Sequence, residues 1–207
     1  IYAAGNSEVS GLGNEAITLS DTSVTDISAL TTLNSNTTGN IDADTVSSFT
    51  GSISDLNTMF AAKAASGDGI SFSSSSGAAD QTVTISDTTD VSVTGLNTLN
   101  GNTTGNIDAT NVTSLASASI SDIKTLLTAG NNSTNNFAAT SFQSLATVAV
   151  SDTTVSIADL NDAIAQANTA TGFGIQLGGN PTTTVFSVAS GALITTGDEA
   201  AFSTLLT

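Results

Sequence analysis

The stretch VTISDTTDVSVTGLNTLNGNTTGNIDATNVTSLASASISDIKTLL (Val83–Leu127) decides how this chain is organised, because related phrases lie on both sides of it. The upstream phrase is Ile17–Phe60, and the downstream phrase is Val148–Gln176, which diverges towards its end. Two landmarks recur at a nearly constant spacing, an aspartate in each SDT turn and a glycine in each TTG or ATG: Asp21, Asp87 and Asp152, then Gly39, Gly105 and Gly172. A fixed period of this kind predicts a repeat architecture.

Short helices are predicted where a serine precedes apolar residues that recur every three or four positions. The serine, followed three residues later by an acid or glycine, is typical of a helix N-terminus. It occurs at Ser23–Asp26, Ser52–Asp55, Ser92–Gly95, Ser119–Asp122 and Ser156–Asp159. A further helix is expected over Thr196–Leu206.

Short strands are predicted between these helices, in segments rich in β-branched residues. They are Asn40–Ala43, Val46–Phe49, Gln81–Ile85, Asn106–Ala109, Val112–Leu115, Ala146–Val150, Phe173–Leu177 and Val185–Val188. The glycines of the TTG and ATG phrases follow the longer helices, which indicates C-terminal stops for those helices.

The fold class we expect is an α/β repeat: a β-solenoid-like stack of short parallel strands with short helices, in about three repeats of ~65 residues. Stacking would bury the apolar stripe that no single strand–helix module can bury alone. A compact α/β or β-sandwich domain with added helices is the alternative. As one continuous solenoid domain, the chain divides into an N-terminal arm or cap (1–16), repeat 1 (17–82), repeat 2 (83–147), and a divergent repeat 3 with a C-terminal cap (148–207).

The composition excludes several classes of partner. The formal net charge is −16 with only two lysines and no arginine, so binding to nucleic acid or to an anionic membrane surface is not expected. No apolar run approaches the ~20 residues of a membrane span. The absence of histidine and cysteine excludes Ser-His-Asp and Cys-His catalysis, and we expect no enzyme.

Calcium is the one cofactor that the sequence leaves open, because aspartate-rich loops can supply oxygen ligands. The candidate ligands are Asp42, Asp44, Asp87 and Asp90. In the alternative interpretation, these aspartates stabilise turns through their side chains or cap helices.

Four phrases carry a resemblance to known proteins: TISDTT (84–89), SVTGLNTLN (92–100), NTTGNIDAT (102–110) and SIADLNDAI (156–164). Their texture resembles the degenerate repeats of large cyanobacterial and marine bacterial cell-surface proteins, which are adhesin-like or surface-layer-like and secreted. Similar textures occur in fibres of marine phages. The resemblance covers about residues 17–165 and implies an extracellular location with a structural or adhesive role.

Two functions of different classes follow as hypotheses. The first is an extracellular structural subunit that assembles with copies of itself into a filament, sheath or surface layer. The second is a repeat module of a bacterial adhesin or phage fibre that binds a cell-surface glycan. Exposed rings at Phe137 or Phe173 would favour the second hypothesis, because glycan surfaces stack on aromatic side chains. A calcium-responsive folding unit is a third hypothesis.

Overall fold

The computed structural model describes most of the repeat region. It covers residues 13–63, 69–72, 80–131, 137–138, 141–142, 145, 147–167, 185–188 and 193–195. Most of the predicted arm, the predicted strand Phe173–Leu177 and the predicted helix Thr196–Leu206 lie outside the described residues.

All strand pairings of the described residues are parallel. One sheet has the order β1 (Ile17–Thr18), β3 (Asn40–Asp42) and β5 (Gly69–Ser71). The second has the order β2 (Ser23–Val24), β4 (Ser48–Gly51), β6 (Thr82–Ile85) and β7 (Ile107–Asp108). Two further pairs are β8 (Thr147–Val150) with β10 (Val185–Val188) and β9 (Thr154–Ser156) with β11 (Leu193–Thr195).

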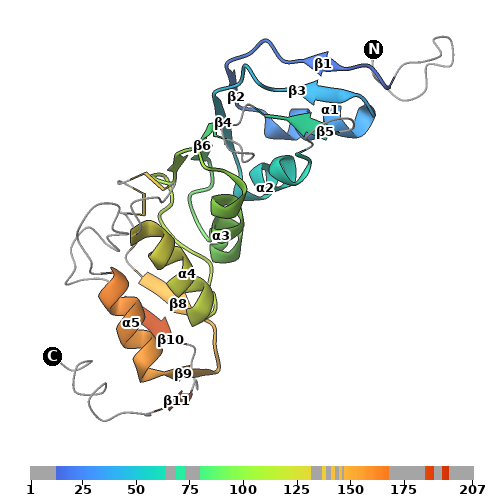
Figure 1. Cartoon of the computed structure of the whole chain (residues 1–207). Helices are drawn as coiled ribbons and strands as arrows, with labels where there is room; N and C mark the ends of the chain where they lie inside the picture. Colours follow the sequence, from blue (N-terminus) through green and yellow to red (C-terminus); the bar gives the residue numbers. More distant parts are fainter. Residues whose placement is uncertain are drawn as a thin grey trace.

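Helices connect these strands, so the fold is α/β with β-α-β units. The described helices are α1 (Ile27–Asn36), α2 (Ile53–Ala61), α3 (Val93–Asn102), α4 (Ile120–Asn131) and α5 (Ile157–Ala167). Each helix packs against the next one along the chain. Figure 1 shows this progression, with β1 at one end of the molecule and β11 at the other.

The register of strand pairing repeats with the sequence period. Ile17 pairs with Ile41, and Val83 pairs with Ile107, so the two paired residues are separated by the same number of positions in both places. Both partners of the second pair lie one full sequence period beyond those of the first. The register therefore follows the sequence period at these two places, whereas the third repeat departs from it, because Val148 pairs with the more distant Phe186.

We call each stretch that pairs with a neighbouring stretch along the chain a strand–helix unit. The described residues form six: 17–36, 40–61, 69–102, 107–131, 137–167, and β10 with β11. The number of residues between paired positions differs from one pair of units to the next. It is smaller between the first and second units, where Ser23 pairs with Ser48, than between the second and third units, where Ser48 pairs with Thr82. It is larger again between the fifth and sixth units, where Thr147 pairs with Val185.

Apolar side chains from strands and helices form the core between the two layers. Phe49, Phe60 and Phe72 pack with their ring centroids 5.4–6.2 Å apart. Phe137 and Phe142 form a second ring pair at 5.3 Å. Burying each such ring contributes about 1.5–3 kcal/mol to folding, so the stacking contacts between units supply much of the stability.

The start of the first helix differs from the prediction. Ser23 and Val24 form β2, and α1 begins at Ile27 with Asp26 as its N-cap. The Asp26 carboxylate accepts hydrogen bonds from the Ala29 backbone N–H at 2.9 Å and from the Ser28 hydroxyl at 2.8 Å. The prediction of Ser23 as the cap was wrong, because Asp26 is itself a strong cap and the preceding residues pair with β4.

The two described TTG glycines also act differently from the prediction. Helices α1 and α3 are followed by the C-cap residues Thr37 and Thr103, which have extended backbone, and the glycines do not adopt a positive φ. A Cβ added at Gly39 would lie 2.1 Å from the Glu15 carbonyl oxygen, and one at Gly105 would lie 1.9 Å from that of Gln81. These glycines allow the backbones of adjacent units to touch; they are not left-handed helix stops.

Candidate functional site

The N-termini of four helices form a recurrent polar structure. In α2 the Ser52 hydroxyl accepts from the Asp55 backbone N–H at 3.1 Å and donates to the Asp55 carboxylate at 2.8 Å. The same pair of contacts occurs in α4 and α5, and Ser92 accepts from Gly95 at the start of α3. The predicted caps are confirmed at Ser52, Ser92, Ser119 and Ser156.

The aspartates of the SDT turns join one unit to another. Asp87 Oδ2 accepts from the backbone N–H of Ile53, the first residue of α2, at 2.6 Å. Asp152 Oδ2 accepts in the same way from Ile120, the first residue of α4, also at 2.6 Å. A carboxylate is favourable there, because the first N–H groups of a helix have no partner inside the helix and carry a partial positive charge.

Sequence reasoning missed this long-range role of the SDT aspartates. A signal was nevertheless present, because each acid follows a serine-capped helix start at a similar distance. Asp87 lies 34 residues after Ile53, and Asp152 lies 32 residues after Ile120.

The other candidate calcium ligands lie in turns. Asp42 Oδ1 accepts from the Asp44 backbone N–H at 3.0 Å, a turn that Asp108 repeats with Thr110 at 2.9 Å. Asp90 adopts a left-handed φ of 53°, which aspartate tolerates better than most residues. The Asp42 carboxylate thus has a local conformational role, and Asp44 contributes only its backbone N–H to this turn.

The described residues bring no three acidic side chains together in a group that could hold a metal ion. Asp87 is engaged with a helix terminus, and Asp44 lines a pocket of about 250 Å³ together with Asp80, Ser47 and Gln81. Calcium binding by Asp42, Asp44, Asp87 or Asp90 stays a prediction.

A second set of polar contacts ties successive helices together through the fifth residue of α2, α3 and α4. Asn57 Nδ2 donates to the Gly95 carbonyl at 2.9 Å, and Asn97 Nδ2 donates to the Asp122 carbonyl at 3.0 Å. The fifth residue of α4 is Lys124, which reaches the Asp159 carboxylate of α5. The same helix position therefore serves the same purpose with three different partners.

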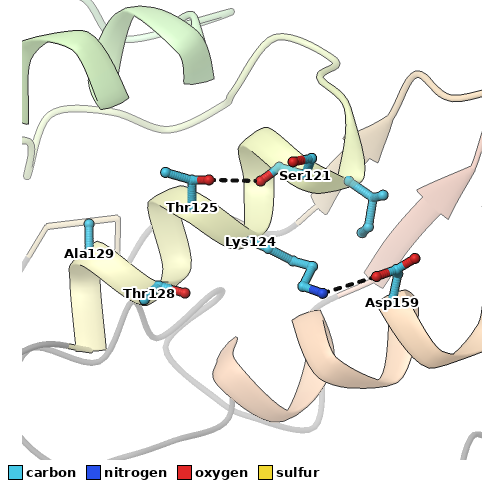
Figure 2. A pocket seen from close by; sticks show the side chains of 7 residues that line it. Ser121, Lys124, Thr125, Thr128, Ala129 and Asp159 are labelled. Carbon is cyan, nitrogen blue, oxygen red and sulfur yellow. Dashed lines mark hydrogen bonds and ion pairs between the residues drawn. The ribbon is translucent and has the colours of Figure 1, made fainter.

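Lys124 lines an open hollow of about 580 Å³ beside α4 and α5. Its Nζ lies 3.0 Å from Asp159 Oδ1 and 2.8 Å from Asp162 Oδ2. Figure 2 shows the ammonium directed at Asp159, while Ser121 and Thr125 lie on the other side of the helix. The hydrogen bonds to Asp162 and Asp159 raise the pKa of Lys124, so its charge is stabilised.

These contacts make Lys124 a poor base for catalysis. A base must release its proton near neutral pH, and a catalytic lysine reaches this state when its pKa falls. The pKa of Asp159 is lowered by the Ser156 hydroxyl and by Lys124, and the pKa of Asp162 is lowered chiefly by Lys124. All three groups are thus held in their charged forms.

The aromatic side chain named for glycan binding is not available on the surface. Phe137 is 1% exposed and packs against Phe142, while Phe173 lies outside the described residues. The described residues therefore give no aromatic support to the glycan hypothesis.

Comparison with known proteins finds no matching family model, no matching curated protein and no matching solved structure. In the part of the chain that the structure describes, no helix is long and apolar enough to cross a membrane.

Proposed function

We propose that this chain is an extracellular structural protein that assembles with copies of itself into a filament, sheath or surface layer. In this proposal the strand–helix units continue as an α/β solenoid, and contacts between chains resemble contacts between units. The carrying observation is the repeated register, Ile17 with Ile41 and Val83 with Ile107, because such a stack has no intrinsic end.

The strand edges of the first and last units support self-association. Among the described residues, β1 pairs only with β3, and β11 pairs only with β9. An exposed parallel edge presents unpaired N–H and C=O groups, which proteins either cover or use for assembly. The two edges belong to opposite ends of the molecule in Figure 1, an arrangement suited to linear growth.

The polar contacts support a structural role and not a catalytic one. The serines, aspartates and asparagines described above complete helix ends and join helices, so their recurrence has a structural reason. We accordingly propose that the chain has no enzymatic activity.

Electron microscopy of the purified chain at neutral pH, with and without a chelator, tests this proposal. We expect regular filaments or sheets in both conditions. If filaments form without the chelator and disappear with it, the self-assembly proposal stands and assembly requires calcium. Single particles in both conditions, at all protein concentrations, would contradict the self-assembly proposal.

A further inference from the structure

The chain has almost no positive charge with which to balance its acids. It carries 18 acidic residues and two lysines, which gives a formal net charge of −16. Ion pairs can therefore neutralise only a small fraction of the acids, whether the pairs form within one copy or between two copies. The remaining negative charge keeps copies apart unless mobile cations from the solvent balance it.

One of the two lysines is already engaged inside the chain. Lys124 Nζ lies 3.0 Å from Asp159 Oδ1 and 2.8 Å from Asp162 Oδ2, so two acids of the neighbouring helix share its charge. Lys63, the other lysine, is half-buried shortly after the end of α2. A second copy therefore meets a surface that offers at most one further lysine to its acids.

The acids lie at the surface of successive units. None of the acidic residues that the structure describes is buried. The exposed ones include Asp21 and Asp26 in the first unit, Asp44 in the second, and Asp80 and Asp90 in the third. The negative charge is therefore spread along the chain, and a copy that approaches from any of these units meets it.

Most of the described contacts between units do not use opposite charges. Strands pair through backbone groups, as β4 does with β6, and Asn57 and Asn97 donate to backbone carbonyls of the next helix. Between units, the described residues form ion pairs at Lys124. An interface between copies that resembles the backbone and amide contacts is neutral, so it leaves the repulsion between the acids of the two copies uncompensated.

The salt concentration decides how far this repulsion reaches. The Debye length is about 30 Å at 0.01 M ionic strength, about 10 Å at 0.1 M and about 3 Å at 1 M. In dilute salt the acids of two copies therefore repel one another over distances longer than the diameter of a helix, which is about 10 Å. In concentrated salt only charges close to contact still interact.

We propose that ionic strength controls the assembly of this chain: copies stay apart in dilute salt and associate once mobile cations screen their acids. The cations act as a diffuse atmosphere and need no fixed site, so sodium, magnesium and calcium all support assembly. This inference rests on the self-assembly proposed above and adds the condition under which it occurs.

The test measures association of the full chain at neutral pH by sedimentation velocity, at several protein concentrations and in about 0.01, 0.1 and 0.5 M NaCl. We expect the association constant to rise on the order of 100-fold from the lowest to the highest salt concentration. Magnesium chloride and calcium chloride at equal ionic strength should promote association equally, because screening depends on the charge of the cation and not on its identity.

A triple variant separates repulsion between acids from other effects of salt. Asp21→Asn, Asp44→Asn and Asp80→Asn together change the net charge from −16 to −13, since each removes one negative charge. These carboxylates are exposed and make no hydrogen bond among the described residues, so the changes should leave the fold intact. The variant should associate at lower salt than the wild type. The matched control, Asp21→Glu, Asp44→Glu and Asp80→Glu, keeps the charge and should associate as the wild type does.

Four outcomes would overturn this inference, and they are distinguishable. If the wild type associates equally well in the lowest and highest salt concentrations, repulsion does not control assembly and the self-assembly proposal stands. If calcium promotes association at far lower ionic strength than magnesium, a specific cation site controls it. If the asparagine and glutamate variants have the same salt dependence, salt acts through groups other than these acids. If the wild type stays monomeric at every salt and protein concentration, the self-assembly proposal itself fails, and this inference fails with it.

Discussion

The carboxylate of Asp152 lies 2.6 Å from the backbone nitrogen of Ile120, although the two residues are 32 positions apart. Asp87 and Ile53 have the same relationship, at 2.6 Å and 34 positions apart. In both places an acid in the turn of one strand–helix unit completes the helix of the unit before it. In these two SDT turns, the aspartate therefore links its own unit to the helix of the preceding unit.

Asp152→Ala should lower the free energy of unfolding by about 1–2 kcal/mol, since it removes a cap from the first turn of α4. Urea unfolding followed by circular dichroism measures the change. Asp44→Ala is the control, because its exposed carboxylate makes no hydrogen bond among the described residues, and its effect should stay within ~0.5 kcal/mol. Equal effects from the two variants would show that net charge, and not the cap, is responsible.

Ser52→Ala should destabilise the chain by about 1 kcal/mol, because the hydroxyl both accepts from the Asp55 N–H and donates to its carboxylate. Ser54→Ala, a little further along the helix, is the matched control. Ser54 is exposed inside α2, where alanine is the better helix former, so this variant should be neutral or slightly stabilising. Chemical unfolding measures the free energy of unfolding of both variants. A loss for Ser54→Ala as large as for Ser52→Ala would contradict the role of Ser52 as the cap.

Gly105→Ala should be the most damaging single change, costing about 3 kcal/mol or more, because its Cβ would lie 1.9 Å from the Gln81 carbonyl oxygen. Relief requires the backbones of two units to separate. Gly101→Ala is the control in the same helix–turn region, since its Cβ would meet nothing within 4 Å. In α3 this second change should stabilise by about 0.5–1 kcal/mol. Thermal unfolding measures both melting temperatures. A shift of both in the same direction would contradict the steric role assigned to Gly105.

Lys124→Met should lower stability by at most ~1 kcal/mol at neutral pH, because the lysine, Asp159 and Asp162 are 27%, 43% and 49% exposed and water screens their attraction. The pKa of each acid is below the ordinary 3.8, so the stability they contribute is full above that pH and is lost as pH falls through the lowered values. The pKa of Lys124 is above 10.5, so its contribution is lost only as pH rises through that higher value.

The difference in melting temperature between wild type and Lys124→Met should therefore be constant from about pH 5 to pH 9 and shrink below about pH 4. Lys124→Arg, which keeps the charge, should behave like the wild type over this range. A difference that persists unchanged at about pH 2 would show that the lysine stem, and not its charge, supports α4 against α5.

The helices and most of their caps could be predicted from local sequence. Ser52, Ser92, Ser119 and Ser156 are caps because a hydroxyl can reach an N–H three residues away in any helix that starts there. The apolar stripes behind them supply the buried residues of α2, α3 and α5. Such features depend on neighbours within one turn of helix, so the sequence contains all the information they need.

The roles of Asp87, Gly39 and Gly105 could not be predicted in the same way. Their partners are Ile53, Glu15 and Gln81, which are all distant from them along the chain. The sequence by itself determined an α/β chain with capped helices. Only the tertiary structure decided which backbones touch and which helix each acid completes, because the register of strand pairing brings those distant groups together.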